Sequence, residues 1–196
     1  MIAAALTQPK AKAQRHWTYD EIVAELPETH QPIELWNGEI IMSPAPHPNH
    51  QRIVGRFYKS LDQFVGKRGL GEVLVSPCDV VLTQKRVVQP DVLFISKARL
   101  GIVKNYVDGV PDLAMEVISE ASWQRDRIQK KALYEQSGLL EYWIIDPDSQ
   151  TIEVFALVKS AFQLHSRAVG AQMAKSKLLA GFSLAFRDLL LTPSVL

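Results

Sequence analysis

The sequence predicts a single α/β domain, in which helices flank a mixed central sheet. Two observations support this prediction. Apolar side chains recur at helical spacing in two long segments, and shorter apolar runs that suit strands lie between and after them. The 196 residues are 47% apolar and 22% charged, which is ordinary for a one-domain globular protein. We therefore expect residues 17–196 to form one domain and residues 1–16 to be a loose N-terminal tail.

The first elements are expected to be a helix and a hairpin. Thr18 and Glu21 have the spacing of a capping box, so a helix should begin there and end near Pro27. Asn37-Gly38 separates two apolar-rich runs within residues 33–42, which is the strongest short signal of a β-hairpin. After a proline-rich loop, apolar residues at helical spacing predict a second helix over about 50–67.

The remaining elements alternate between strands and helices. A further long helix is expected over about 122–137, with Gly138 after its last residue. A short helix is expected near 184–190. The expected strands lie at about 72–76, 79–83, 90–95, 113–118, 141–146, 151–157 and 162–166.

The charge balance and the single cysteine restrict the class of protein. The net charge is +1, so no global field attracts nucleic acid, and any such binding must come from local basic segments. Cys78 is the only cysteine, which excludes an internal disulfide and suits a reducing compartment. No run is long and apolar enough for a membrane helix, and we expect a cytoplasmic protein. Two segments could bind phosphates, although solvated helix faces also explain them: Arg52, Arg56, Lys59, Lys67 and Arg68, and Arg125, Arg127, Lys130 and Lys131.

Glu116 is the first candidate for a metal ligand. It lies in Leu113–Ile118, an apolar run typical of a strand that is buried on both faces. A lone carboxylate there would be strongly destabilised by loss of hydration, unless a metal ion or a cationic side chain compensated its charge. The alternative is a glutamate near the strand end that reaches solvent.

Two Pro-Asp pairs offer a second carboxylate. Asp112 lies four residues before Glu116 on the same expected strand, and four residues span about 13 Å. The oxygen ligands of one hard cation lie about 2.0–2.6 Å from it, so these two residues cannot share one. Asp91 begins a different apolar run and can share a cation with Glu116 only if the two strands are neighbours. We therefore expect Asp91 as the second ligand and Asp112 as a strand-start residue.

Lys130 is the candidate for the cationic partner. Asp126, Lys130 and Tyr134 follow one another at intervals of four, so they share one stripe of the expected long helix. Asp126 and Lys130 could form only a surface ion pair, worth about 0.3–0.5 kcal/mol. The alternative is that Lys130 leans toward the carboxylates and places its charge on a phosphate or a water molecule.

Taken together, these residues resemble the Uma-type family of restriction endonucleases, which belongs to the PD-(D/E)xK nuclease superfamily. The resemblance covers roughly residues 17–157. Upstream it rests on Glu34–Ile40, Ser43–His50 and Pro90-Asp91. Its most specific part runs from Glu116 to Pro147, where several spacings hold together: Glu116–Ser119, Asp126–Lys130, Tyr134, Gly138, Glu141–Trp143 and Asp146-Pro147.

The resemblance implies a restriction-endonuclease-like fold, a divalent metal (Mg²⁺ or Mn²⁺) and hydrolysis of DNA phosphodiester bonds. It implies that Asp91, Glu116 and the backbone carbonyl of Val117 bind the metal. The superfamily places a lysine two residues after the glutamate, where this chain has Ile118. The Uma-type pattern has a lysine on a helix instead, and Lys130 matches it. Lys130 would then orient a water molecule or stabilise the transition state.

Further candidates lie around this core set. Glu34 adds a carboxylate from the hairpin or holds a second ion, and pairing with a basic neighbour is equally consistent. His50 is a candidate nucleic-acid contact near the site, or a polar histidine of the loop. Arg125, Arg127 and Lys131 are candidate contacts to DNA phosphates from the long helix.

Other functions stay open at this stage. The missing strand lysine and the near-neutral net charge favour a catalytically inactive nucleic-acid-binding or protein-interaction module with the same fold. An enzyme that acts on RNA or branched DNA is a further alternative. For cleavage of both strands of a duplex we expect a homodimer with two-fold symmetry, and we expect no membrane partner.

Overall fold

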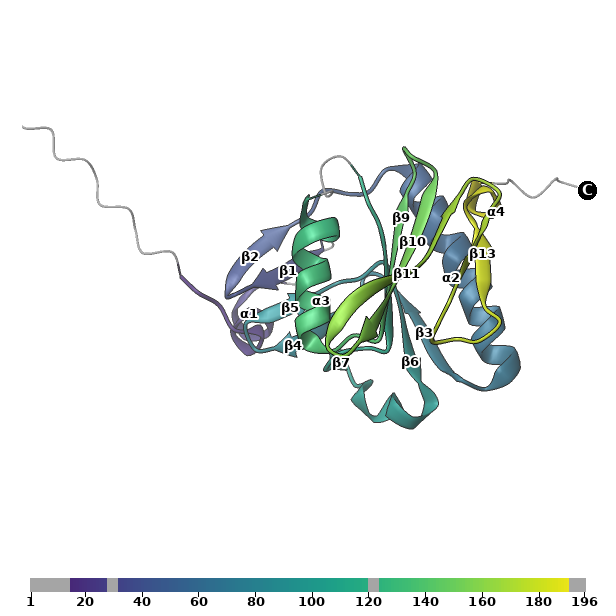
Figure 1. Cartoon of the computed structure of the whole chain (residues 1–196). Coiled ribbons are helices and arrows are strands. Elements are labelled where there is room, and N and C mark those ends of the chain that lie inside the picture. The colour runs from purple at the N-terminus through teal and green to yellow at the C-terminus, as the bar shows by residue number, and fades with distance from the viewer. Residues whose placement is uncertain (1–14, 28–31, 120–123, 191–196) are drawn as a thin grey trace, which may run out of the picture.

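The computed structural model describes residues 15–27, 32–119 and 124–190, and within these ranges the chain forms two larger sheets and a short strand pair (Figure 1). The first sheet has the order β2 (Glu39–Met42), β1 (Ile33–Trp36), β5 (Arg86–Val88), β4 (Val80–Thr83) and β7 (Val107–Asp108). The central sheet has the order β11 (Ala161–Val169), β10 (Thr151–Val158), β9 (Glu141–Asp146), β8 (Leu113–Val117), β6 (Val92–Ser96) and β3 (Gly71–Val75).

The helices cover both faces of the central sheet. The helical elements are, in chain order, α1 (Tyr19–Glu25), α2 (Pro48–Arg68), the 3₁₀ turn η1 (Lys97–Ile102), the π-helical turn η2 (Arg125–Lys130), α3 (Lys131–Ser137) and α4 (Phe186–Leu190). The strand pair β12 (Met173–Lys175) and β13 (Ser183–Ala185) precedes α4. In Figure 1, α2 and α4 lie on one side of the central sheet, and α3 lies on the other side near the hairpin.

Local sequence explains the N-terminal elements. The Thr18 side chain accepts a hydrogen bond from the Glu21 backbone N–H, and the Glu21 carboxylate accepts one from the Thr18 backbone N–H, which completes the predicted capping box. Asn37 and Gly38 both adopt positive φ, as a two-residue hairpin turn requires, and they join β1 to β2. Arg15 and His16, at the end of the expected tail, contact α1 and the hairpin. Residues 1–14 lie outside the described residues.

The central sheet separates two hydrophobic clusters. Leu113, Met115 and Val117 of β8 pack against α2 on one face. Ala114 and Ile118 pack on the other face in a cluster that includes α3 residues and Val80 and Val88 of the first sheet. Alternate residues of a strand point to opposite faces, so Glu116 points toward the α3 side. This places a carboxylate where an apolar side chain would be ordinary.

The structure confirms the predicted fold class, a mixed central sheet flanked by helices with an N-terminal helix and β-hairpin, and corrects several details. The hairpin and residues 80–83 belong to a second sheet, because they pair with β5, a strand that the sequence did not reveal. Strands β7, β12 and β13 were also missed. The predicted long helix begins with a π turn at residues 125–130, and its expected start at 122 lies outside the described residues. The predicted strands at 113–118, 141–146 and 151–157 are confirmed within one residue at each end.

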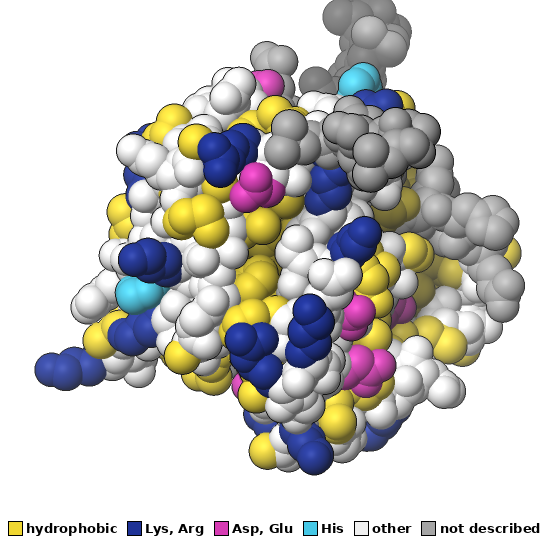
Figure 2. All heavy atoms as spheres, turned by 90° about the vertical axis from the view of Figure 1, so that its right-hand side faces the viewer, with side chains coloured by type: hydrophobic (Ala, Val, Ile, Leu, Met, Phe, Trp, Pro, Cys, Tyr) yellow, Lys and Arg dark blue, Asp and Glu magenta, His cyan; other side chains and the backbone are white. Residues whose placement is uncertain are grey.

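Basic side chains are dispersed on the face that carries α2 and α4. Figure 2 shows Lys and Arg side chains spread over this face, with apolar side chains between them, rather than one continuous patch. Arg52, Lys59 and Lys67 are exposed along α2, whereas Arg56 donates a hydrogen bond to the carbonyl of Leu189. These observations favour a solvated helix face. None of the described helices combines the length and apolar character of a membrane span.

Candidate active site

Glu116 occupies a buried position near the end of β8. Its side chain lies 2.8 Å from Nζ of Lys130, measured from Oε1, and the hydroxyl of Tyr134 donates to the same oxygen at 3.1 Å. Glu116 is 3% exposed and Lys130 is 4% exposed. The glutamate therefore does not reach solvent, and its compensation comes from the helical segment that packs on this face of the sheet.

Lys130 is shared by three carboxylates. Its Nζ lies 2.8 Å from Glu116, 2.9 Å from Oε1 of Glu34 and 3.6 Å from Oδ1 of Asp126. All four side chains are buried, so the interpretation of Asp126 and Lys130 as a surface ion pair is wrong. We call these four residues together with Asp91 the carboxylate cluster.

The turn that presents Lys130 has π-helical geometry. Residues Arg125–Lys130 form the π turn, and π turns in proteins are frequent at functional sites. The hydroxyl of Tyr142 donates to the backbone carbonyl of Asp126 at 2.9 Å and holds this turn against β9. The α-helix that follows then carries Tyr134 to Glu116. The predicted stripe of Asp126, Lys130 and Tyr134 is therefore real and faces the sheet.

Glu34 enters the cluster from the first sheet. Besides Lys130, its carboxylate accepts hydrogen bonds from the indole Nε1 of Trp36 at 3.2 Å and from the backbone of Gln89 at 3.1 Å. Nη1 of Arg125 lies 3.9 Å from Oε2 of Glu34 and donates a hydrogen bond to Oγ of Ser43. Of the alternatives for Glu34, the structure therefore supports pairing with a basic residue, and that residue belongs to the carboxylate cluster.

Asp91 comes to Glu116 through neighbouring strands. β6 and β8 pair antiparallel with Val92 opposite Met115, so the register continued by one residue sets Asp91 opposite Glu116. The backbone N–H of Val117 donates to Oδ2 of Asp91 at 2.8 Å. Asp91 and Glu116 were expected to share a cation only if their strands were neighbours, and β6 and β8 are neighbours.

His50 faces Asp91 from the first turn of α2. Its Nε2 lies 3.2 Å from Oδ2 of Asp91, and its Nδ1 is buried with no hydrogen-bond partner among the described residues. The alternative that His50 is a polar residue of the loop is wrong, because the helix begins at Pro48. Burial lowers the pKa of His50, although Asp126 opposes this change. Burial therefore disfavours the protonated form of the imidazole beside the carboxylate.

The cluster holds more acidic than basic side chains, and the pKa values of two of its acids are raised. Burial raises the pKa of Asp91 to about 7, against the hydrogen bond from Val117 and the charge of Lys130, which lower it. Burial, followed by the charges of Asp126 and Asp91, also raises the pKa of Glu116 well above its ordinary value. Such shifts indicate that an additional cation would stabilise the ionised carboxylates.

The remaining shifts show which charges are already compensated. Burial opposes ionisation of Glu34, but Lys130 and the hydrogen bonds from Gln89 and Trp36 outweigh it and lower the pKa of Glu34. Burial likewise opposes the charge of Lys130, but Glu116 and Glu34 hold its pKa well above the ordinary value. Glu34 and Lys130 therefore form a charged pair, whereas Asp91 and Glu116 share the surplus of negative charge.

The residues of the cluster fit a divalent-ion site with one or two protein carboxylates better than a site in which many side chains surround the ion. In the described part of the chain, no three or more His, Cys, Asp or Glu side chains are arranged as a metal-binding group. Nζ of Lys130 contacts Glu34, Glu116 and Asp126 at once. Mg²⁺ commonly takes one or two carboxylates and completes its shell with water and substrate phosphates. Asp91 and Glu116 are suited to that role.

Comparison with known proteins identifies the family. The family model Uma2, described as "Putative restriction endonuclease", matches residues 20–187. The chain belongs to the Uma2 family. The predicted resemblance is confirmed, and the family and the fold are those of a nuclease of the restriction-endonuclease type.

A solved structure supports the fold of this Uma2-family chain. The crystal structure of "a putative nuclease belonging to DUF820" from Anabaena variabilis ATCC 29413 matches with a TM-score of 0.72 and 21% identity. The match covers 88% of this chain and 96% of the other. No curated protein matches this chain.

In this Uma2-family chain, Lys130 lies on the same side of the central sheet as Ile118, the position where the superfamily pattern has a lysine. Ile118 lies on the same face of β8 as Glu116 and is buried in the hydrophobic cluster of that face. Lys130 approaches Glu116 from the helix that packs on that face. A lysine side chain at position 118 and that of Lys130 would therefore both lie on the face of β8 that carries Glu116.

The other basic candidates are only partly brought to the cluster. Arg125 lies at the cluster, near Glu34. Arg127 instead pairs with Glu153 of β10, and Nζ of Lys131 lies 3.7 Å from the centre of the Phe155 ring on the same strand. The proposed contacts of Arg127 and Lys131 with DNA phosphates stay predictions.

Sequence reasoning missed part of the site. Tyr134 and Asp126 were placed on the correct stripe but not among the site residues, and Trp36 and the backbone of Gln89 were not considered. The stripe spacing was the available signal for the first two. Asp112 behaves as predicted, because it pairs with Arg99 and accepts from the Ser96 backbone at the start of β8.

Proposed function

We propose that this chain is a metal-dependent endonuclease that hydrolyses phosphodiester bonds in DNA. The observation that carries the proposal is the convergence of Lys130, Glu116 and Asp91 from a helix and two adjacent strands. The raised pKa of two buried carboxylates in this cluster adds to it, because a surplus of buried negative charge is costly without a cation. Membership in the Uma2 family supports the reaction class.

The metal would be Mg²⁺, with Mn²⁺ as a substitute, held by Asp91, Glu116 and the backbone carbonyl of Val117. When bound, such an ion lowers the pKa of a water molecule and offsets charge on the phosphate. The hydrogen bond from the Val117 N–H fixes Asp91 with one oxygen directed at β8. His50 touches the same oxygen and restricts the rotation of the Asp91 carboxylate.

Lys130 would supply a fixed positive charge next to the reacting phosphate. Its contacts with Glu34 and Asp126 hold the ammonium in position, and its raised pKa keeps it protonated. A preorganised charge in a water-poor site stabilises a transition state more than the same charge in water. Glu34 is proposed as the residue that positions Lys130, and Arg125, beside it, as a contact to the DNA backbone.

Cleavage of both strands of a duplex requires two such sites, so we propose a homodimer with two-fold symmetry. Sedimentation or light scattering of the purified protein tests this proposal. A mass that corresponds to one chain at the concentration of a cleavage assay would refute it.

The decisive experiment is cleavage of plasmid and single-stranded DNA with and without Mg²⁺. We expect cleavage by the wild type that disappears with EDTA and with Asp91→Ala or Glu116→Ala. Asp62→Ala, which removes an exposed carboxylate of α2, is the matched control and should retain activity. Retained DNA binding without cleavage by the wild type would support an inactive binding module instead. Cleavage that survives both site substitutions would refute the proposed site.

A further inference from the structure

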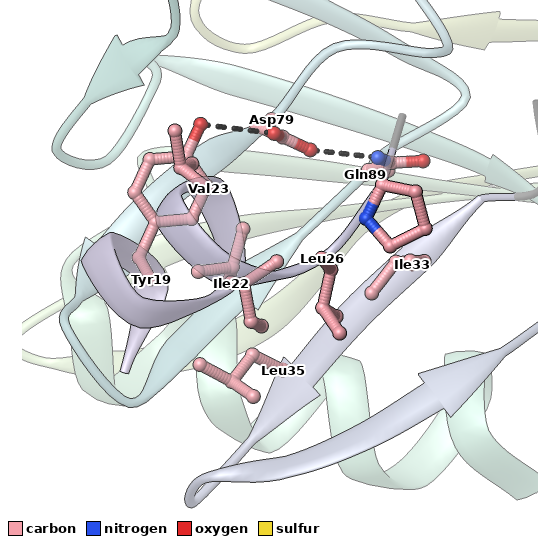
Figure 3. A pocket seen from close by; sticks show the side chains of 10 residues that line it. Tyr19, Ile22, Val23, Leu26, Ile33, Leu35, Asp79 and Gln89 are labelled. Carbon is pink, nitrogen blue, oxygen red and sulfur yellow. Dashed lines mark hydrogen bonds between the residues drawn. The ribbon is translucent and has the colours of Figure 1, made fainter. Parts of the chain in front are cut away.

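Two buried side-chain atoms in the described part of the chain have no hydrogen-bond partner, Nδ1 of His50 and Oε1 of Gln89. Gln89 lines a cavity of about 310 Å³ between α1 and the first sheet (Figure 3). There its Nε2 donates to Oδ1 of Asp79 at 2.7 Å, and the hydroxyl of Tyr19 donates to Oδ2 of the same carboxylate at 3.0 Å. This row of hydrogen bonds joins α1 to the first sheet, which gives Gln89 a structural role.

The cavity is separate from the carboxylate cluster, whereas His50 lies at the cluster. Ile33 and Leu35 line the cavity, so Glu34 between them points to the opposite face of β1, where the cluster lies. His50 instead contacts Asp91, a member of the cluster. Of the two unpartnered groups, the imidazole is therefore the one that can take part in the chemistry of the site.

The buried face of α2 carries His50 to the central sheet. His50 lies in the first turn of the helix, and Ile53 and Phe57, three and seven positions later, share its face and are fully buried. An imidazole on this otherwise apolar face loses hydration, so it requires a polar partner. Asp91, directly before β6, is that partner.

Asp91 faces an imidazole, whereas the other acids of the cluster face an ammonium group. Nζ of Lys130 forms salt bridges with the three other acids of the cluster. Among the described residues, the salt-bridge partner of Asp91 is His50. A neutral imidazole supplies no full positive charge, so the Asp91 carboxylate can still accept a cation.

The separation of His50 and Asp91 suits two ligands of one ion. In an octahedral shell with ligand atoms about 2.1 Å from the ion, neighbouring ligand atoms lie about 3.0 Å apart. Nε2 of His50 and Oδ2 of Asp91 are 3.2 Å apart. The backbone N–H of Val117 occupies one lone pair of Oδ2 and leaves the other for His50 or for a cation. The two side chains can therefore hold an ion without a large movement of the helix or the strand.

The imidazole of His50 is free to present either a donor or a lone pair. With its proton on Nε2, the ring donates to Asp91, and with the proton on Nδ1, Nε2 offers a lone pair to a metal ion. No hydrogen bond from the described residues to Nδ1 holds the ring in one tautomer. The ring can therefore donate to Asp91 when no ion is bound and act as a ligand when one is.

We propose that His50 is a further ligand of the metal ion, bound through Nε2 beside Asp91. Imidazole is a better ligand for first-row transition ions than for Mg²⁺, which prefers oxygen. The site should therefore bind Mn²⁺ more tightly than Mg²⁺. This inference rests on the metal site of the proposed function, but it does not depend on DNA as the substrate.

The test is pulsed electron paramagnetic resonance of the full chain loaded with Mn²⁺ in the absence of DNA. A coordinated imidazole nitrogen modulates the spin echo of Mn²⁺, whereas oxygen ligands do not. We expect this nitrogen modulation in the wild type and its loss in His50→Gln. Its absence from the Mn²⁺-loaded wild type would overturn the proposal whether or not His50→Gln folds, and its persistence in His50→Gln would overturn it as well.

His47→Asn is the matched control. His47 is a neighbouring histidine, is exposed and caps α2 through its side chain. Asparagine is also a good N-cap residue, so this variant should retain the helix cap. The nitrogen modulation should persist in it, and loss of the modulation there would contradict the assignment to His50.

Calorimetric titration with Mg²⁺ and Mn²⁺ separates metal ligation from positioning. The amide of His50→Gln can still donate to Asp91, but it lacks the imidazole nitrogen. The wild type should bind Mn²⁺ at least about tenfold more tightly than Mg²⁺, and His50→Gln should reduce this ratio at least about threefold. An unchanged ratio would show that His50 only positions Asp91 and would overturn the proposal.

The two proposals fail separately in these experiments. Mn²⁺ binding and Mg²⁺-dependent DNA cleavage without nitrogen modulation would overturn the role of His50 and leave the endonuclease standing. Nitrogen modulation in a wild type that cleaves no DNA would do the reverse. Failure of the wild type to bind either ion would refute both.

Discussion

Two buried glutamates at opposite ends of one strand pair illustrate two uses of a carboxylate. β8 and β9 run parallel, with Leu113 opposite Glu141 and Glu116 opposite Ile144. Glu141 is fully buried and accepts hydrogen bonds from the indole of Trp143, the hydroxyl of Ser176 and the backbone N–H groups of residues 177 and 178. Its charge is thus distributed over neutral donors.

Glu116 has a different environment. One ammonium group, that of Lys130, serves Glu116, Glu34 and Asp126, and Asp91 adds a further carboxylate on the adjacent strand. The Glu141 environment is satisfied by the protein alone and fixes the segment before β13 to the central sheet. The Glu116 environment keeps a surplus of negative charge, which is suited to binding a cation. Burial by itself therefore does not mark a functional carboxylate, whereas an imbalance of charge does.

The largest expected difference between the two regions is in catalysis. Asp91→Ala and Glu116→Ala should each reduce Mg²⁺-dependent DNA cleavage by at least about 1,000-fold, because each removes a proposed metal ligand. Glu141→Gln should change the rate only a few-fold. Initial rates on supercoiled plasmid measure both. Equal losses in Glu141→Gln and Glu116→Ala would remove the functional distinction.

The next largest effect should be on stability, where the substitution of Glu141 should be strongly felt although its effect on catalysis is small. Glu141→Ala leaves several buried donors without an acceptor and should lower the free energy of unfolding by about 3–5 kcal/mol. Glu72→Ala, at an exposed glutamate on β3, should stay within about 0.5 kcal/mol of the wild type. Urea unfolding followed by circular dichroism tests the pair. A wild-type stability in Glu141→Ala would contradict the structural role.

These two regions also show how far the sequence could predict the molecule. Thr18, Asn37-Gly38 and the apolar spacing of residues 48–68 act locally, so the helices and the hairpin were predictable. Asp91, Glu116, Lys130 and Glu34 were predicted from buried charge and from family resemblance. By contrast, the pairing of β1 with β5 joins residues about 50 positions apart, and no local pattern reports such a contact.

The contacts of Glu141 were not predictable for the same reason. Its donors Ser176 and residues 177–178 lie 35–37 positions later in the chain. The π turn at residues 125–130 was likewise invisible, because α and π turns draw on the same helix-forming residues. A sequence can thus place chemistry on an element, but it cannot show which charges a fold leaves unbalanced.

Lys130 distinguishes metal binding from catalysis. Lys130→Met should reduce cleavage about 100-fold, because the fixed charge beside the phosphate is lost. The same variant should bind Mg²⁺ at least as tightly as the wild type, because a competing cation has left Glu34, Glu116 and Asp126. Cleavage rate and calorimetric affinity are measured on the same preparation. Loss of metal affinity together with activity would show that Lys130 only maintains the fold of the site.

The surplus of negative charge at the carboxylate cluster should also make stability depend on pH. The pKa of Asp91 is about 7 in the folded protein and its ordinary value is 3.8, so the folded protein holds the proton more tightly than the unfolded chain does. The stability that this proton contributes is complete below about pH 4 and is lost as the pH rises through about 7. Urea unfolding of the metal-free protein from pH 5 to 8 should show this decline. Asp91→Asn should flatten it, and an identical slope in that variant would assign the decline to another group.

Calorimetric titration with Mg²⁺ and Mn²⁺ at pH 8 tests the central claim most directly. The wild type and Glu141→Gln should each bind the ion at the carboxylate cluster with similar affinity, while Glu116→Gln and Asp91→Asn should bind it at least about tenfold more weakly. Undiminished binding in both Glu116→Gln and Asp91→Asn, or no binding by the wild type, would contradict the assignment of the carboxylate cluster as the metal site.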